Sequence, residues 1–289
     1  MIHIIVGPTG SGKTKAANRL AEYLSCPIIN ADAFQIYQDM DIGTAKISKD
    51  DKSYFRYHLL DIRKPNELYS VKEYQDDFRR CMSSILKEYK DVVVVGGTGL
   101  YIRASIYDYI FMEEEISNND YSSFTNEELY ERLVNLDKEE ANKIHVNNRK
   151  RIIRALDLIS ASGKNKSDII NSQEHKLIYD DVNIYFINPD RETLYQVINE
   201  RVDQMIELGL VEEVKSLVAK YQLSTTAKAA IGYKEILDYL AGNSTLEEAI
   251  ELIKKRSRNY AKRQVTFFKN QFNSKIFPSS NALIKEIIK

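Results

Sequence analysis

Eight residues near the start of the chain match a phosphate-binding loop at every fixed position of the pattern G-x-x-x-x-G-K-[ST]. They are Gly7, Pro8, Thr9, Gly10, Ser11, Gly12, Lys13 and Thr14. An apolar segment, 2–6, precedes the loop, and residues 13–24 carry apolar side chains at helical spacing after it. In a strand, loop and helix of this kind, backbone N–H groups surround phosphate oxygens at the helix N-terminus. Lys13 would then reach an outer phosphate, and the Thr14 hydroxyl would hold a magnesium ion.

The elements that must position this loop alternate between strand and helix. Buried strands are expected at 2–6, 27–29, 92–95, 183–187 and 275–277. Ser70, Asp190 and Thr245 are side chains that cap helices, and Ser70 and Thr245 each have glutamate three residues later. The four valines of 92–95 are typical of a central parallel strand that is buried on both faces. We therefore predict an α/β fold, with a P-loop NTPase-like parallel sheet core flanked by helices.

Residues 113–180 differ from the sequence on either side. They begin acidic and polar, and then carry helical patterns from Thr125, from Lys138 to His145 and from Asn148 to Ser160. No strong strand pattern occurs among them. We predict a discontinuous P-loop core domain, 1–112 and 181–289, interrupted by a small all-helical insertion domain, 113–180.

Bulk properties exclude several classes of protein. The chain has 289 residues, with 41 basic and 42 acidic side chains, so its net charge of −1 argues neither for nor against a nucleic-acid partner. No apolar run approaches the ~20 residues of a membrane-spanning helix, and no signal peptide or zinc-site spacing is recognised. Cys26 and Cys81 are expected to be reduced thiols. We predict a cytoplasmic protein and a monomer.

The polar residues that follow the predicted strands indicate where a ligand binds. In open parallel sheets, ligands bind beyond the carboxyl ends of the strands. Asp32 follows the second strand and Thr98 the third. A P-loop ATPase typically has a magnesium-binding carboxylate after a central strand, whereas 96–99 here reads Gly-Gly-Thr-Gly, which argues against nucleotide hydrolysis. From the residues alone, Asp32 as a helix cap and the glycines as a plain turn stay open.

A series of motifs resembles the tRNA dimethylallyltransferases, also called tRNA isopentenyltransferases, in their order along the chain. The motifs are 32–37 (DAFQIY), 40–46 (MDIGTAK), 58–61 (HLLD), 96–101 (GGTGLY), 151–156 (RIIRAL), 231–235 (IGYKE) and 260–264 (YAKRQ). Many families share the phosphate loop, but its combination with these motifs is far more specific. The resemblance covers nearly the whole chain.

The resemblance implies a reaction and its participants. The dimethylallyl group of dimethylallyl diphosphate would be transferred to the exocyclic amine of the adenosine just 3′ of the anticodon in tRNA, releasing diphosphate. The phosphate loop and Arg201 would bind the diphosphate with Mg²⁺, and Asp32 would be the general base that accepts the proton of the amine. Thr98, Lys13 and Arg201 complete the implied catalytic set. The implied tRNA-binding residues are Asp32, Ala33, Phe34, Gln35, Thr98, Lys150, Arg151, Arg154, Gly232, Tyr233 and Lys234.

Two basic stretches extend this interpretation. Arg151 and Arg154 match a tRNA-contacting motif of the family, so the insertion is predicted to grip the anticodon stem-loop through backbone phosphates. Residues 254–269 contain seven basic and no acidic side chains. That stretch is compatible both with tRNA contact and with core packing, because an apolar stripe runs along the same segment.

The sequence also departs from the family at several positions. Residues 147–150 read Asn-Asn-Arg-Lys where Asn-Asp-Pro is common, and Phe267 replaces a usual tryptophan. Three alternatives stay open: a P-loop kinase acting on a small metabolite, an isopentenyltransferase acting on free adenine nucleotide, and a nucleic-acid binding protein whose catalytic site has decayed. The intact Lys13, Thr14 and Asp32 argue against the third alternative.

Overall fold

The computed structural model describes residues 1–111, 119–165, 167–168 and 175–288. The chain divides into two compact units. One is the core unit, Met1–Ser105 with Tyr179–Lys289, and the other is the insertion unit, Ile106–Ile178. The predicted insertion, 113–180, overlaps the second unit, which begins earlier in the chain because an antiparallel bridge pairs Tyr107 with Leu177. No helix in the described ranges is long and apolar enough to cross a membrane.

The core unit contains a parallel sheet with the strand order β3-β2-β4-β1-β5-β6. The strands are β1 (Ile2–Val6), β2 (Ile28–Asn30), β3 (Tyr57–His58), β4 (Val92–Gly96), β5 (Val182–Ile187) and β6 (Lys275–Phe277). Val6 lies opposite Gly96 and Phe186, and Asn30 lies opposite Val95. Because these strands end in register, the segments that follow β1, β2 and β4 all emerge at one edge of the sheet. The expected α/β parallel-sheet fold is confirmed.

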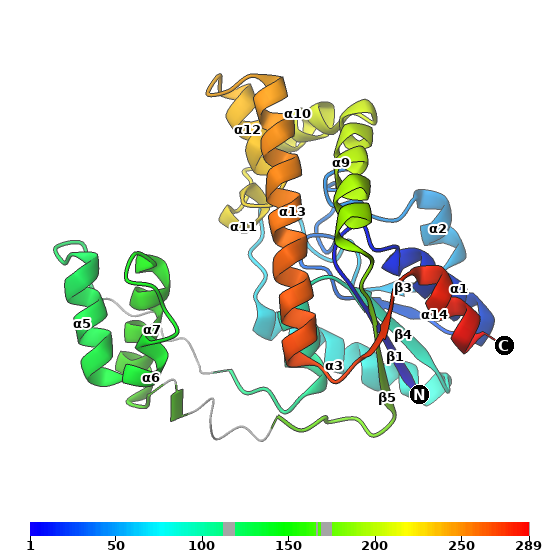
Figure 1. Cartoon of the computed structure of the whole chain (residues 1–289), viewed down its shortest axis with the longest axis horizontal. Coiled ribbons are helices and arrows are strands. Elements are labelled where there is room, and N and C mark those ends of the chain that lie inside the picture. The colour runs from blue at the N-terminus through cyan, green and yellow to red at the C-terminus, as the bar shows by residue number, and fades with distance from the viewer. Residues whose placement is uncertain (112–118, 166, 169–174, 289) are drawn as a thin grey trace. The chain divides into compact units, whose positions relative to one another are not determined.

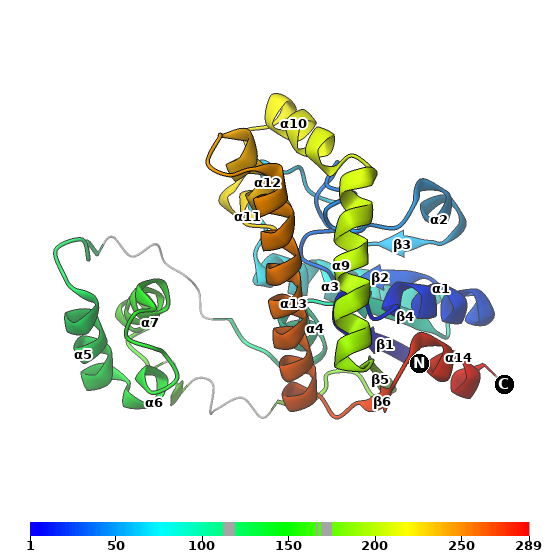
Figure 2. The same cartoon turned by 45° about the horizontal axis from the view of Figure 1, so that its top comes forward.

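Helices cover the sheet and frame this edge (Figures 1 and 2). They are α1 (Lys13–Leu24), α2 (Lys49–Tyr54), α3 (Val71–Glu88), α4 (Gly99–Ile106), α9 (Arg191–Glu207), α10 (Leu210–Lys220), α11 (Thr225–Lys228), α12 (Tyr233–Leu240), α13 (Leu246–Gln271) and α14 (Ser280–Ile287). The long helix α13 packs along α9 and α12, and α1 packs on β4 and α14. The strands β1 and β4 are therefore completely buried, as their apolar runs predict.

Local signals in the sequence are found again in the structure. Capping boxes begin α3 at Ser70 and α13 at Thr245, and the Asp190 carboxylate accepts backbone N–H groups at the start of α9. The elements α2, β3, α4, α10, α11, α12 and α14 were not predicted. The strand β3 has only two residues at the edge of the sheet, so it is too short to show a periodic pattern.

The insertion unit has its own small core. Its helices are α5 (Asn126–Leu136), α6 (Lys138–Ala141) and α7 (Arg149–Ser162), and α5 packs against both others. Its buried apolar residues are Leu129, Leu133, Ala141, Ile144, Ile152, Ala155, Leu156 and Ile159. The prediction of a helix from Lys138 to His145 is wrong at its end. The helix stops at Ala141, and the following turns bring Ile144 into this core.

Candidate active site

The phosphate loop connects β1 to α1 and has the backbone shape that its glycines allow. Gly10 and Gly12 both have φ of 80°, which side chains with a Cβ rarely adopt. The helix α1 begins at Lys13, whose Nζ donates to the Pro8 carbonyl at 3.3 Å. The Ser11 hydroxyl is buried and has no hydrogen-bond partner among the described residues. The loop thus places backbone amides and a lysine at a helix N-terminus, which favours phosphate binding.

Lys13, Arg201 and Asp32 share one electrostatic neighbourhood, although they come from α1, α9 and the segment after β2. Burial lowers the pKa of Lys13 to about 8; the Asp32 carboxylate raises it, and the Arg201 guanidinium lowers it further. Burial likewise lowers the pKa of Arg201, and Asp32 opposes that shift. Two partly desolvated cations beside one carboxylate are typical of a site that binds an anion next to a proton acceptor.

Asp32 and Thr98 are held by backbone groups at the ends of neighbouring strands. The Phe34 amide donates to Asp32 Oδ1 at 3.0 Å, and the Ala33 amide donates to Thr98 Oγ1 at 3.0 Å. Residues 31–40 contain no helix, so the alternative of Asp32 as a helix cap is wrong. The carboxylate instead bonds its own backbone two residues ahead, which fixes its direction.

Tyr260 on α13 lies beside this pair. Burial, followed by the charge of Asp32, raises the pKa of Tyr260 to about 12, whereas hydrogen bonding to Thr98 opposes the shift. The tyrosine therefore remains a neutral hydroxyl group. The YAKRQ motif marked this segment in the sequence, but it did not assign Tyr260 a place next to Asp32.

The segment 41–46 is anchored by charged side chains on both sides. The buried Lys46 ammonium lies 2.8 Å from Asp41 and 2.7 Å from Asp61, and it donates to the Tyr37 carbonyl. Glu213 of α10 accepts the amides of residues 41, 42 and 43 at 3.0, 2.7 and 3.2 Å. Glu213 was not identified from the sequence, because no motif surrounds it. The backbone amides that it accepts lie about 170 residues earlier in the chain.

The anchored segment in turn contacts two predicted site residues. Gln35 Nε2 donates to the carbonyls of Thr44 and Ala45 at 3.1 and 3.3 Å. Arg201 Nη2 approaches the Ala45 carbonyl at 3.5 Å. The segment therefore positions Arg201, and it occupies the amide donors of Gln35, which leaves the Gln35 carbonyl oxygen for a substrate contact.

The predicted tRNA-binding residues of the IGYKE motif divide into two groups. Gly232 and Tyr233 are buried, and the Tyr233 hydroxyl donates to Glu213 at 2.6 Å. Lys234 is exposed. A direct tRNA contact by the Tyr233 side chain does not fit this packing, since the ring supports the anchored segment. Of these three residues, Lys234 is the one whose side chain is accessible to tRNA.

The basic stretch 254–269 is also divided. Lys254 pairs with Asp203 and Glu251, Arg256 pairs with Glu235, and Arg258 donates to Asn199. Lys255, Lys262, Arg263 and Lys269 are exposed. Lys262 and Arg263 line a shallow pocket with a volume of about 560 Å³. The other residues that line it are Asn259, Thr266, Phe267, Asn270 and Gln271. One part of the stretch therefore holds α13 against α9 and α12, and the other presents positive charge to solvent.

The basic group of the insertion unit shows a similar division. Arg149 donates to the carbonyls of Phe124 and Tyr121 at 2.8 and 2.6 Å, so it holds α7 to the segment before α5. Lys150, Arg151 and Arg154 are exposed. Asn148 caps α7 by accepting the Arg151 amide, so the helix forms without the usual Asn-Asp-Pro sequence.

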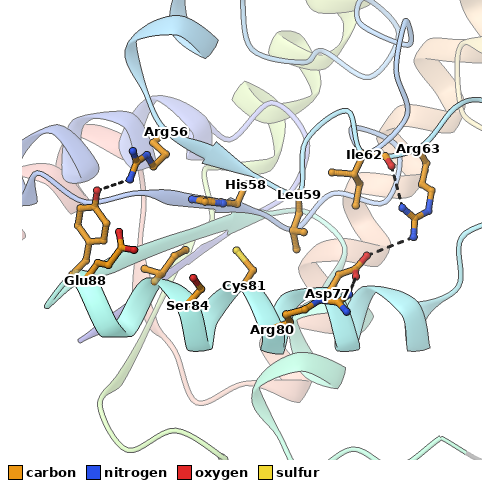
Figure 3. Close-up of a pocket in the computed structure, with 12 residues that line it drawn as sticks. Arg56, His58, Leu59, Ile62, Arg63, Asp77, Arg80, Cys81, Ser84 and Glu88 are labelled. Atoms are coloured by element: carbon orange, nitrogen blue, oxygen red, sulfur yellow. Dashed lines mark hydrogen bonds and ion pairs between the residues drawn. The ribbon is translucent and has the colours of Figure 1, made fainter.

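A separate pocket of about 580 Å³ lies between β3 and α3, and no predicted site residue lines it (Figure 3). Its arginines already have partners: Arg56 donates to the Tyr89 hydroxyl, and Arg63 and Arg80 pair with Asp77. Burial lowers the pKa of His58, so the imidazole is neutral near pH 7. His58 and Leu59 of the HLLD motif line this pocket, but none of the predicted catalytic, diphosphate-binding or tRNA-binding residues does.

The parallel sheet, the glycine-rich loop after β1 and the lysine at the start of α1 define an α/β protein with a P-loop-like fold. The family model described as IPP transferase matches residues 35–271. The chain therefore belongs to the IPP transferase family, as the resemblance predicts.

Relatives agree with this assignment over almost the whole chain. The chain is 43% identical over 286 residues to the tRNA dimethylallyltransferase of Anoxybacillus flavithermus, covering 98% of this chain and 92% of that protein. It is 44% identical over 277 residues to the enzyme of the same name from Geobacillus thermodenitrificans, covering 93% and 88%.

Solved structures give the same result. The tRNA isopentenylpyrophosphate transferase of Staphylococcus epidermidis superposes with a TM-score of 0.73 at 37% identity, covering 99% of this chain and 96% of that chain. A eukaryotic dimethylallyltransferase acting on tRNA superposes with a TM-score of 0.83 at 26% identity, covering 98% and 75%.

Proposed function

We propose that this protein is a tRNA dimethylallyltransferase, which transfers the dimethylallyl group of dimethylallyl diphosphate to the exocyclic amine of the adenosine 3′ of the anticodon. The observation that carries the proposal is the grouping of Lys13, Arg201 and Asp32 at one edge of the sheet, in a chain of this family. The cations suit a diphosphate leaving group, and the carboxylate suits a proton leaving the amine.

The leaving group would be stabilised by the phosphate loop. Breaking the allylic C–O bond places positive charge on carbon and additional negative charge on the diphosphate. The loop amides, Lys13 and Arg201 are already oriented and partly desolvated, so they stabilise this charge as it develops, and the barrier falls. The loop therefore binds a leaving group, without phosphate hydrolysis.

The nucleophile would be activated by Asp32. The lone pair of the adenine amine is delocalised into the ring, which makes the amine a weak nucleophile. As the new C–N bond forms, the amine loses a proton, and Asp32 accepts it. Thr98, held by the Ala33 amide and next to Tyr260, orients the amine or the carboxylate. To reach this site the adenine must leave the anticodon-loop stack, at a cost of a few kcal/mol.

Magnesium fits this site as an ion held mainly by substrate oxygens. Within the described ranges, no group of three or more His, Cys, Asp or Glu side chains could hold a metal. Mg²⁺ commonly keeps several waters and binds one or two protein ligands plus substrate phosphates. We propose Thr14, in the first turn of α1, as its protein ligand. When bound, the ion would neutralise part of the diphosphate charge.

The insertion unit would hold the anticodon stem-loop through Lys150, Arg151 and Arg154. Ala33, Phe34, Gln35, Thr98 and Lys234 of the core unit would also contact the tRNA. Exposed Lys and Arg side chains bind backbone phosphates without reading sequence. All of the proposed catalytic residues belong to the core unit, and we propose that the enzyme is a monomer. Because the proposed substrate is tRNA, we propose a cytoplasmic location.

The test is a transfer assay with labelled dimethylallyl diphosphate, magnesium and unmodified tRNA. Label should enter the tRNA, and it should not enter a matched tRNA in which guanosine replaces the target adenosine. Labelling of AMP in preference to tRNA would instead support an enzyme that acts on free nucleotide. Phosphate transfer from ATP to a metabolite, without tRNA labelling, would overturn the proposal in favour of a kinase.

A further inference from the structure

Gln264 connects the two loops that would hold the two substrates. The side chain comes from α13 and is only 5% exposed. Its Oε1 accepts the Thr9 amide of the phosphate loop at 2.9 Å, and its Nε2 donates to the Gly97 carbonyl at 2.9 Å. One amide group therefore bridges the loop after β1 and the loop after β4.

The bridge lies close to the proposed general base. A Cβ added at Gly97 would lie 2.4 Å from Gln264 Nε2 and 3.7 Å from Asp32 Oδ2. Only glycine leaves room for the amide at this point. Tyr260 precedes Gln264 by four residues, so the two side chains lie on one face of α13, and the Tyr260 hydroxyl interacts with Thr98. This face of α13 therefore bonds the loop after β4 at Gly97 and the phosphate loop at Thr9.

A primary amide is the group that this position requires. It supplies an acceptor for the Thr9 amide and a donor for the Gly97 carbonyl, whereas an ionised carboxylate only accepts. The Thr9 amide precedes both positive-φ glycines, Gly10 and Gly12. The bridge occupies only the Thr9 amide of this loop, and of the amides that follow, that of Ser11 donates to the Pro8 carbonyl at 3.2 Å.

We propose that Gln264 is a positioning residue for prenyl transfer. It clasps the phosphate loop to the Gly97–Thr98 loop, and thereby fixes the distance between the allylic carbon on the diphosphate and the adenine amine beside Asp32. In-line displacement depends steeply on such a distance, because about 1 Å of misplacement can cost on the order of 10²-fold in rate. This inference rests on the proposed function.

The variants Gln264→Met and Gln264→Glu test the clasp by the pH dependence of single-turnover prenyl transfer. Gln264→Met keeps the length of the side chain and removes both hydrogen bonds, so its kcat should fall by about 10- to 100-fold with KM for each substrate within about threefold. Gln264→Glu should be equally slow at about pH 8. As pH falls, its carboxyl group gains the proton needed to donate to Gly97, so its rate relative to the native enzyme should rise.

The ratio of Gln264→Met to native activity should stay flat with pH, because methionine does not titrate. Gln204→Met, an exposed position on α9, is the matched control and should behave as native. A native rate for Gln264→Met, or a flat ratio for Gln264→Glu, would overturn the clasp. So would a loss of activity in Gln264→Met that matches its loss of folded protein by circular dichroism.

A second readout separates the clasp from the proposed function. Amide hydrogen exchange over residues 7–14 should be faster in Gln264→Met than in the native protein, whether or not tRNA is the substrate. If the native protein prenylates no tRNA but this difference appears, the clasp stands and the proposed function fails. Equal exchange rates over residues 7–14 in the two proteins would show that Gln264 does not clasp the phosphate loop.

Discussion

The loops at the edge of the core sheet and the basic face of the insertion unit hold their functional side chains in opposite ways. Asp32, Thr98 and Gln264 each accept or donate specific backbone hydrogen bonds. Lys150 and Arg151, in contrast, are exposed on one face of α7, whose other face fills a small apolar core. Bond making requires fixed distances between reacting atoms, whereas attraction to a polyanion requires only accessible charge.

This contrast predicts where substitutions act. Changes at the sheet edge should reduce the rate of the bound complex and leave tRNA affinity nearly unchanged. Changes on the basic face should reduce tRNA affinity and leave chemistry intact. The following four experiments test that division, from the largest expected effect to the smallest.

Asp32→Ala should reduce single-turnover transfer by about 10²- to 10⁴-fold at saturating substrates, because a general base acts mainly in the transition state. Binding of tRNA, measured by filter retention, should change little. Asp76→Ala, an exposed carboxylate paired with Lys72 on α3, should have native activity. If Asp32→Ala abolished tRNA binding and kept the turnover of the bound complex, its assignment as the base would be wrong.

Lys13→Met should reduce turnover by about 10²- to 10³-fold, as expected when one charge-stabilising donor is removed. The substitution should also remove the pH dependence of diphosphate affinity that the native lysine causes. Burial lowers the pKa of Lys13 to about 8 in the free protein, so the ammonium loses its proton as pH rises through that value. The affinity of the native protein for inorganic diphosphate should therefore fall above about pH 8, by up to about tenfold for each pH unit.

Isothermal titration from about pH 7 to about pH 9.5 measures this effect. Titration of the diphosphate itself is common to both proteins, so the ratio of native to Lys13→Met affinity isolates the lysine. Lys15→Met, an exposed neighbour, should keep the native profile. A ratio that does not change with pH would show that Lys13 does not titrate in this range.

Glu213→Gln should loosen the segment 41–46 and misplace Arg201 through Ala45. In the native protein, the donors around Glu213 share two carboxylate oxygens, whereas a glutamine side chain offers one acceptor oxygen. Some of the buried N–H groups would therefore lose their partner, at a cost of about 1–3 kcal/mol. We expect kcat/KM to fall by about tenfold, and Tm to fall by about 2–4 °C for each kcal/mol of stability removed. Glu212→Gln is the matched control, because that side chain is exposed and pairs with Lys215 on the same helix. Native kinetics in Glu213→Gln would contradict the anchor.

The double variant Arg151→Ala with Arg154→Ala should weaken tRNA binding several-fold and flatten its salt dependence. The log–log slope should decrease by up to about one unit for each tRNA phosphate that the arginines no longer neutralise. Dimethylallyl diphosphate binding should survive, because its proposed site belongs to the core unit. Fluorescence anisotropy across salt concentrations measures the slope.

Arg149→Ala provides the contrast within the same helix. This residue bonds the carbonyls of Tyr121 and Phe124, so its removal should lower thermal stability and keep the salt slope. If the double variant behaved like Arg149→Ala, its arginines would be structural. If the salt dependence of tRNA binding did not change in the double variant, the proposal that these arginines bind tRNA phosphates would be wrong.

The sequence by itself determined the features that depend on neighbours a few residues apart. The phosphate loop is a local shape set by Gly10, Gly12 and the start of a helix. The capping boxes at Ser70 and Thr245 join residues three apart. Asp32 and Thr98 were predicted to be close because parallel strands end at one edge, and this rule needs only the strand pattern.

Only the tertiary structure decided which side chains hold these features in place. Thr9 and Gln264 are 255 positions apart, and Asp41 and Glu213 are 172 apart. The burial of Tyr233 likewise follows from the packing of α12 against a distant segment. Such contacts leave no periodic signal, because a glutamine or glutamate on a polar helix face has the same local sequence whether it faces solvent or a loop of the site. Their roles appear only when folding brings the two segments together.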